Sequence, residues 1–225
     1  MNVKMIVFDM AGTTIDEDNI VYKTLHKSIN EYGVDVDLSA VLSVGAGQEK
    51  LTAIKDIVTR YGNQEDLLKA SDMYNYFMNH LQAAYEEFDI KAMQNAASVL
   101  MNIRSKGILV VLNTGYDRNT AAFILNKIKW TQLNEYDLLV TASDVPKNRP
   151  APDMIHFAMN HFSLNDANCV VKIGDSKIDI EEGRNAHCLY SIGITTGAQT
   201  KAQLMEANPD TIIDNLDELI SFLKI

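Results

Sequence analysis

The chain has only 2 cysteines, 4 prolines and a single tryptophan among its 225 residues. Two thiols cannot build the disulfide framework of a small secreted protein. We expect Cys169 and Cys188, which lie in apolar surroundings, to be core thiols in a reducing cytosol. The 5 histidines are scattered without metal-ligand spacing, which argues against a zinc site. Three of the prolines fall in the segment SDVPKNRPAP, which indicates a loop.

Long hydrophobic runs and an excess of positive charge are also absent. No apolar run approaches the length of a membrane span, and the N-terminus does not have the pattern of a signal peptide. We therefore expect a cytoplasmic protein without a membrane partner. The formal net charge of -10 repels phosphate backbones, which argues against nucleic acid as a partner. If the substrate is a small anion, the protein must then provide positively charged groups locally, within the binding site.

What the chain does contain is a series of short, continuous apolar runs, typical of parallel strands covered on both faces. Helical patterns separate the later runs, so we predict an α/β fold with a Rossmann-like, doubly wound parallel sheet. The predicted strands are Met5–Phe8, Ile108–Leu112, Leu138–Thr141, Val170–Ile173, Leu189–Ile194 and a short edge at Thr211–Ile213. A helix is expected at Asp153–Phe162, where the last proline of the loop can open it.

A long insert between the first two strands, about Asp16 to Phe88, has helical periodicity throughout. We predict that residues 16–88 form a small helical cap domain over the strand ends, and that residues 1–15 and 89–225 form the core. The clearest cap helices are expected at Tyr22–Tyr32, Gln48–Tyr61 and Glu65–Phe88. Large apolar side chains crowd the last of them, which indicates cap core; the alternative is a contact between two copies in a homodimer. These side chains are Met73, Tyr74, Tyr76, Phe77, Met78, Leu81 and Tyr85.

Polar residues follow the predicted strands at the edge where open α/β sheets bind their ligands. Asp9 follows the first strand and Thr114 the second, Arg149 lies in the loop after the third, and Asp175 and Asp179 follow the fourth. Each of them alone is a common turn, cap or surface residue. Their shared placement predicts the transfer of a phosphoryl group, which needs a nucleophile, a Mg²⁺ site and donors for the phosphoryl oxygens.

This set resembles the motifs of the haloacid dehalogenase superfamily of hydrolases, in the same order along the chain. Asp9-Met10-Ala11-Gly12-Thr13 is similar to the first motif, Asp-x-Asp-Gly-Thr. The apolar strand that ends in Ser or Thr appears as Val110–Gly115. The third motif, a Lys or Arg often followed by Pro, appears as Arg149-Pro150, and Gly-Asp-x-x-x-Asp appears as Gly174–Asp179.

The resemblance implies a Mg²⁺-dependent hydrolase that acts on a small phosphorylated or phosphonate metabolite beneath a cap that excludes water. Asp9 is implied as the nucleophile that becomes an aspartyl-phosphate, and Thr114 and Arg149 as the residues that hold the phosphoryl oxygens. The implied metal site consists of Asp9, the backbone carbonyl of Ala11, Asp175, and Asp179, which supports the metal or Arg149. The implied substrate-binding residues are Thr13, Lys50, Thr114, Gly115 and Arg149.

Position 11 departs from the phosphatases of this superfamily, in which a second aspartate protonates the leaving alkoxide. Ala11 cannot do so. Either the leaving group needs no proton there, or another residue supplies it, or the protein is a weak or inactive enzyme. The chain looks like the phosphonatase branch, typified by phosphonoacetaldehyde hydrolase, where this position is also alanine. In that branch a cap lysine condenses with the substrate aldehyde, so that P–C cleavage yields an enamine instead of a bare carbanion.

Lys50 is the candidate for such a lysine. At about 100° per residue, Lys50 falls inside an apolar arc of its predicted helix, whereas Lys55 falls outside it. The helix dipole and partial burial both lower the pKa of an amine in a first turn and favour the neutral nucleophile. Gly47-Gln48-Glu49-Lys50 also resembles the branch pattern of Gly, two residues and the imine-forming Lys. Ala46 and Ala53 stand where the branch has Met and His.

Several functions remain open from the sequence. Lys50 can instead be a lysine whose stem covers apolar surface while its amine reaches water. The substrate can then be another phosphonate or a phosphate monoester, hydrolysed without the usual acid. A non-catalytic sensor on the same fold is another alternative, but it would have no need of Asp9, Thr114, Arg149 and Asp175, which argues against it. A dehalogenase is a third, and it would not need the Mg²⁺ ligand Asp175.

Overall fold

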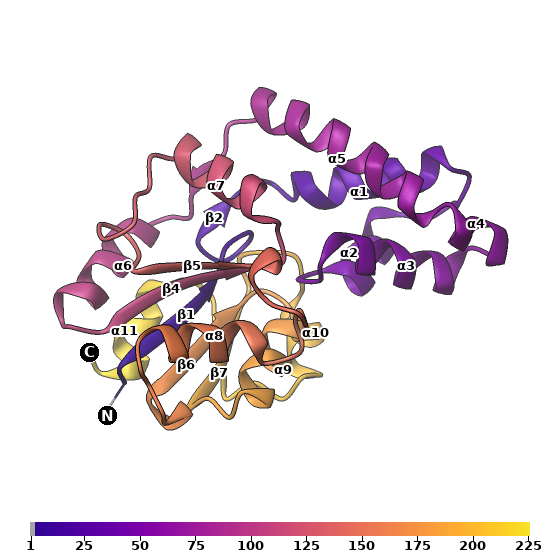
Figure 1. Cartoon of the computed structure of the whole chain (residues 1–225). Coiled ribbons are helices and arrows are strands. Elements are labelled where there is room, and N and C mark those ends of the chain that lie inside the picture. Colours follow the sequence, from indigo (N-terminus) through magenta and orange to yellow (C-terminus); the bar gives the residue numbers. More distant parts are fainter. Residues whose placement is uncertain (1–2) are drawn as a thin grey trace.

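The computed structural model describes residues 3–225 and has an open six-stranded sheet at its centre (Figure 1). Every strand pairs in parallel with its neighbours, in the order β5-β4-β1-β6-β7-β8. The strands are β1 (Met5–Asp9), β4 (Leu109–Thr114), β5 (Leu138–Thr141), β6 (Val170–Gly174), β7 (Tyr190–Ile194) and β8 (Thr211–Ile213). The predicted doubly wound sheet is confirmed. Residues 1 and 2, with which the first predicted core segment begins, lie outside the described residues.

Helices cover both faces of the sheet. Alternate residues of β1 point to opposite faces, so Met5 packs toward α8 (Asp153–His161) and Ile6 toward α6 (Ala96–Ser105). Helices α9 (Lys177–Asn185) and α10 (Lys201–Met205) lie on the α8 side, and α7 (Arg118–Lys127) and α11 (Asp217–Leu223) on the α6 side. Two short 3₁₀ helices are Ala142–Asp144 and Ala167–Cys169. Both thiols are free, as expected.

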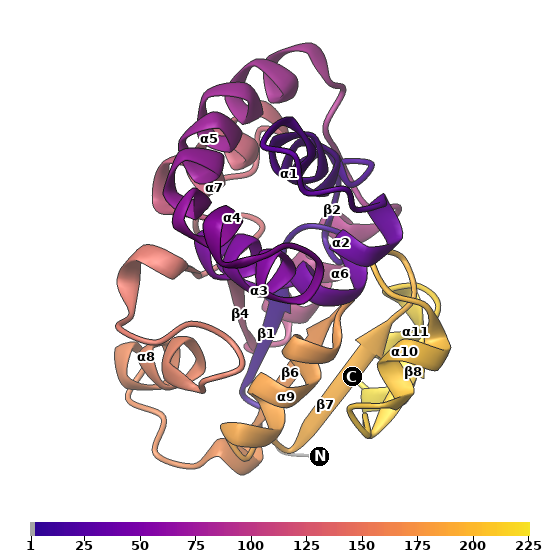
Figure 2. The ribbon, with the colours of Figure 1, turned by 90° about the vertical axis from the view of Figure 1, so that its right-hand side faces the viewer.

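Five helices of the insert gather beyond the carboxyl ends of the strands, as Figures 1 and 2 show. They are α1 (Ile20–Glu31), α2 (Leu38–Gly45), α3 (Lys50–Tyr61), α4 (Gln64–Leu68) and α5 (Ala70–Glu87). The two chain segments that join this insert to the core pair antiparallel through β2 (Ile15–Asp16) and β3 (Lys91–Ala92). We propose that this pair marks the boundary between the cap domain and the core, next to the predicted boundaries at residues 16 and 88.

The continuous helix predicted at Glu65–Phe88 is wrong. Asn63 caps α4 with a capping box, and the amide of Lys69 bonds back to the carbonyls of Asp66 and Leu67. This tight turn ends α4 after 5 residues, and α5 starts anew at Ala70. Helix α2 was not predicted as a separate helix; the side chain of Asp37 caps its first turn.

The apolar face of α5 packs inside the cap, as predicted. Met73, Phe77, Leu81 and Tyr85 are buried, and α5 packs against α1 and α3. Tyr76 lies on the half-buried side and stacks on His80. A homodimer contact through the cap stays a prediction. In the described part of the chain, no helix is both long and apolar enough to cross a membrane.

Candidate active site

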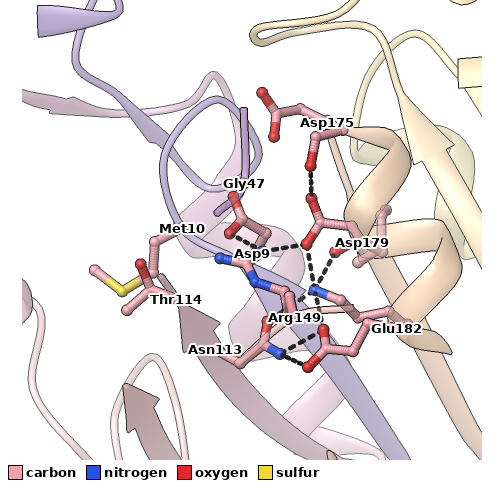
Figure 3. Close-up of polar contacts among 12 residues, drawn as sticks. Asp9, Met10, Gly47, Asn113, Thr114, Arg149, Asp175, Asp179 and Glu182 are labelled. Carbon is pink, nitrogen blue, oxygen red and sulfur yellow. Dashed lines mark hydrogen bonds and ion pairs between the residues drawn. The ribbon is translucent and has the colours of Figure 1, made fainter. Parts of the chain in front are cut away.

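Three carboxylates meet at the carboxyl ends of the central strands (Figure 3). Asp9 is the last residue of β1, Asp175 follows the end of β6, and Asp179 lies in the first turn of α9. One carboxylate oxygen of each lies within 4.8 Å of the others, and all three side chains are buried. The sequence prediction that these residues share one edge of the sheet fits this geometry, because β1 and β6 are hydrogen-bonded neighbours.

Arg149 joins two of these carboxylates. Its Nη1 donates to Oδ1 of Asp9 at 2.8 Å and also donates to Oδ1 of Asp179. Burial raises the pKa of Asp9, and so does the charge of Asp179, whereas Arg149 lowers it. Arg149 therefore favours the ionised form of Asp9, which is the form that can act as a nucleophile.

Lys172, in the middle of β6, forms a second buried cation below the site. Its Nζ lies 2.8 Å from Asp179 and 3.4 Å from Glu182, and donates to Oδ1 of Asn113 at 2.7 Å. The amide of Asn113 in turn donates to both oxygens of Glu182 (Figure 3). Burial alone would raise the pKa of Asp179, but Arg149 and Lys172 outweigh it and hold that pKa at about 2. Asp179 is thus an anion that positions Arg149.

This network was not predicted from the sequence. Its signal was present, since a lysine interrupts the apolar run of the fourth predicted strand in VVKIG. A lysine that is 0% exposed needs a carboxylate partner, which predicts an ion pair beneath the strand ends.

The donor set at this edge fits Mg²⁺. Four buried carboxyl groups, those of Asp9, Asp175, Asp179 and Glu182, lie here beside two buried cations, and burial and the charges of Asp9 and Asp179 raise the pKa of Asp175 well above its ordinary value. Hard oxygen ligands with excess negative charge are what Mg²⁺ prefers. Within residues 3–225, no donor bonds to the carbonyl oxygen of Ala11, which leaves it free as a ligand. Asp179 is occupied by its two cations and by Ser176.

The residues that we predicted to bind the phosphoryl group differ from one another in their contacts. Thr114 ends β4, and its Oγ1 accepts a hydrogen bond from the amide of Tyr116 at 3.1 Å. Gly115 follows it and lines a cavity that also contains Lys50. The hydroxyl of Thr13 is buried and has no hydrogen-bond partner among the described residues. Thr14, beside it, donates to the carbonyl of Asp9 at 3.0 Å and so fixes the loop after β1.

Lys50 is the first residue of α3 and is 6% exposed. Glu49 caps this helix by accepting hydrogen bonds from the amides of Leu51 and Thr52, which explains an acidic residue beside the lysine. The amine of Lys50 donates to the carbonyl of Gln48 at 2.6 Å. Burial and the positive charge of Arg149 lower the pKa of Lys50 to about 8. The geometry thus provides a buried amine that is readily deprotonated.

The loop before Lys50 brings the cap down onto the core. Gly47 has a φ of +76°, and a Cβ there would collide with Ser176 and Ile178 of the core. The amide of Gly47 donates to the hydroxyl of Tyr22 at 2.9 Å, which holds the loop to α1. The cavity beside this contact has a volume of about 190 Å³ and lies between α5 and the loop after β4. Lys50 and the core residues Gly115 and Tyr116 share its wall.

Comparisons with known proteins agree with this geometry. Residues 6–201 match the family model described as haloacid dehalogenase-like hydrolase. Phosphonoacetaldehyde hydrolase of Parabacteroides distasonis is 29% identical over 86% of this chain and 76% of its own length. The enzyme of the same name from Latilactobacillus sakei is 26% identical over 99% and 88%.

Solved structures share the fold. A phosphonoacetaldehyde hydrolase-like protein from Oleispira antarctica superimposes with a TM-score of 0.84 at 22% identity, over 100% of this chain and 92% of that chain. A protein from Clostridium acetobutylicum described as a predicted phosphatase gives 0.80 at 23% identity, over 100% of both chains. The family match covers most of the chain and contains Asp9, Lys50, Arg149 and Asp175. The chain therefore belongs to the haloacid dehalogenase-like hydrolases.

Proposed function

We propose that this protein is a Mg²⁺-dependent phosphonatase that cleaves the P–C bond of phosphonoacetaldehyde or of a closely related aldehyde-bearing phosphonate. The observation that carries the proposal is the buried amine of Lys50, with a pKa of about 8, above a site whose position 11 has no acid. An imine removes the need for that acid, because the electrons of the broken bond pass into the iminium group. The relatives named phosphonoacetaldehyde hydrolase support the same reaction.

The reaction starts at Lys50. Its neutral amine attacks the substrate aldehyde, and loss of water gives an iminium ion. Asp9 then attacks phosphorus, the P–C bond breaks, and its electron pair forms an enamine on the lysine. The enamine carbon takes up one proton, and water hydrolyses the resulting iminium to release acetaldehyde and Lys50. Hydrolysis of the aspartyl-phosphate releases hydrogenphosphate and one proton, which balances the proton that the enamine took up.

The remaining site residues bind and orient the phosphoryl group in this proposal. Arg149 offsets its charge while keeping Asp9 ionised, and Thr13, Thr114 and Gly115 supply hydrogen-bond donors. Asp9, Asp175 and the carbonyl of Ala11 would hold Mg²⁺, with Asp179 behind them as the anchor of Arg149. When bound, the metal supplies positive charge that offsets the approach of an anionic nucleophile to an anionic phosphoryl group.

A phosphate monoester is the second candidate substrate, and one observation favours it. Ala53 offers no proton-transferring group, and its methyl faces α2, because a Cβ built at Gly45 would lie 3.2 Å from the Cβ of Ala53. No group that can transfer a proton therefore stands where the phosphonatase branch has its histidine.

Trapping with borohydride tests the proposal. Phosphonoacetaldehyde and borohydride should together leave a covalent adduct on Lys50, found by mass spectrometry of peptides, and Mg²⁺ should be required for phosphate release. Lys50→Arg should lose both adduct and turnover, because arginine keeps the charge but has no accessible lone pair. Lys55→Arg, at an exposed position of the same helix, is the matched control and should keep both. Retained turnover in Lys50→Arg, with phosphate monoesters as better substrates, would establish the second candidate.

A further inference from the structure

The mechanism above does not use the buried carboxyl group of Glu17. Glu17 lies between β2 and α1 and is only 2% exposed. The hydroxyl of Tyr85, from the end of α5, donates to its Oε2 at 2.5 Å. A carboxyl group buried in the joint between core and cap is costly to keep unless it is hydrogen-bonded or useful.

A hydrogen-bonded chain leads from Glu17 toward the amine of Lys50. The hydroxyl oxygens of Tyr85 and Tyr116 lie 3.0 Å apart, and Tyr116 lines the same cavity as Lys50. The Nζ of Lys50 lies 5.5 Å from the centre of the Tyr116 ring. This hydrogen-bonded path thus takes Glu17 from the joint, Tyr85 from the cap and Tyr116 from the core. It is complete only when the cap lies on the core, as it does in this structure.

We propose that Glu17 is the acid and base of the imine reaction, exchanging protons with the Lys50 cavity through Tyr85 and Tyr116. This inference rests on the proposed function, since it assigns the proton transfers of the Lys50 imine. It also assigns to Glu17 the proton transfers for which Ala53 offers no group.

The hydrogen-bonded path carries a proton away from Glu17 in one step and back to it in a later step, so the protons balance over the whole reaction. When the carbinolamine on Lys50 loses water, its C–O bond breaks and the leaving hydroxyl takes a proton from Tyr116. Tyr116 recovers a proton from Tyr85, and Tyr85 recovers one from Glu17, which ends as a carboxylate. The lone pair of the lysine nitrogen forms the C=N bond. When water later attacks the product iminium, its proton returns by the same route and Glu17 is neutral again.

The surroundings of Glu17 allow its carboxyl group to be either neutral or ionised. Burial raises the pKa of Glu17 to about 7, while the hydrogen bond from Tyr85 and the charge of Lys50 lower it. Tyr22, from α1, is a further titratable group near Glu17, and burial holds the pKa of that phenol well above its ordinary value. An acid with a pKa near neutrality can both give and take a proton at working pH.

The pH profile of imine trapping tests the relay. With cyanoborohydride and phosphonoacetaldehyde, the wild-type rate should rise and then fall with pH, because the reaction needs neutral Lys50 and protonated Glu17. Glu17→Gln should slow trapping by about 100-fold and abolish the fall at high pH, leaving only a rise to a plateau. Tyr85→Phe keeps the carboxyl group but interrupts the chain, and it should give the same two changes.

Glu135→Gln is the matched control. Glu135 is also buried, at 7% exposed, but it accepts hydrogen bonds from Thr131 and Asn134 in a loop of the core. It should keep the wild-type rate and profile. Wild-type rate and profile in both Glu17→Gln and Tyr85→Phe would overturn the role of Glu17 and leave the proposed function standing. A loss in Glu17→Gln alone would overturn the relay through Tyr85. Failure of the wild-type protein to form any adduct would overturn the proposed function and the role of Glu17 together.

Discussion

Gly115 of the core lies directly beneath the backbone of Gly47 in the cap. A Cβ at position 115 would come within 3.0 Å of the carbonyl oxygen of Gly47 and 2.8 Å of that of Gln48. The cap loop that carries Lys50 can therefore rest on the core only because position 115 has no side chain. This contact brings Lys50 and Gly115, at the end of β4 where we propose that phosphoryl oxygens bind, to the wall of one cavity.

Gly115→Ala should hold the cap away from the core. The backbone of Gly115 is not in the left-handed region, so the methyl group costs little except at the cap. We expect kcat/KM to fall by about 100-fold, since a displacement near 1 Å is enough to misalign reacting groups. Steady-state kinetics measure the fall, and an unchanged unfolding midpoint shows that the fold is intact. Unchanged kinetics would mean that closure of this loop is not needed.

Asp9→Asn should abolish phosphate release, because an amide is a far poorer nucleophile than a carboxylate. The variant should fold at least as well as the wild type, since it removes a buried carboxylate whose pKa is raised by burial. Phosphate release and thermal unfolding measure the two effects. Substantial turnover in Asp9→Asn would remove Asp9 from the nucleophile's role.

Removal of the metal should stop turnover. A chelator should abolish phosphate release by the wild-type protein, and added Mg²⁺ should restore it. Asp175→Ala should raise the Mg²⁺ concentration needed for half-maximal activity sharply or abolish activity, because it removes one of the proposed oxygen ligands. Activity that survives chelation would contradict the metal site.

Lys172→Met should destabilise the protein by about 3 kcal/mol or more, because it leaves the buried carboxylate of Glu182 without its cation and leaves Asp179 with Arg149 alone. Urea unfolding measures the loss. Lys55→Met, at an exposed position, should change stability little. If the two substitutions cost the same, the buried network contributes nothing to stability.

Glu17 should also make stability depend on pH. Its pKa is raised from 4.5 to about 7 in the folded protein, so the folded state binds this proton more tightly than the unfolded state. The resulting stabilisation is full below the unfolded pKa and is lost as the pH rises through 7. From about pH 5 to about pH 8, the free energy of unfolding should fall by about 2.5 kcal/mol more in the wild type than in Glu17→Gln. Equal falls in urea unfolding at the two pH values would show that this pKa is not raised.

The sheet and the residues at its edge could be predicted from the amino-acid sequence alone. Continuous apolar runs gave the strands to within two residues, because strands buried on both faces must be apolar throughout. Asp9, Thr114 and Asp175 could be placed because each lies at or just beyond a strand end, and parallel strands end at one edge. Lys50 could be found from the apolar arc of α3, which is a local property of a helix.

Which buried side chains contact one another could be seen only once the chain was folded in three dimensions. Tyr85 lies 68 residues from Glu17 and 31 from Tyr116, and Lys172 is 59 residues from Asn113, so no local period relates these partners. The break between α4 and α5 was likewise hidden, because the apolar pattern continues across Lys69 while the backbone turns. Periodicity records which face of an element is buried, but the partner of a buried polar group depends on how cap and core pack together in three dimensions.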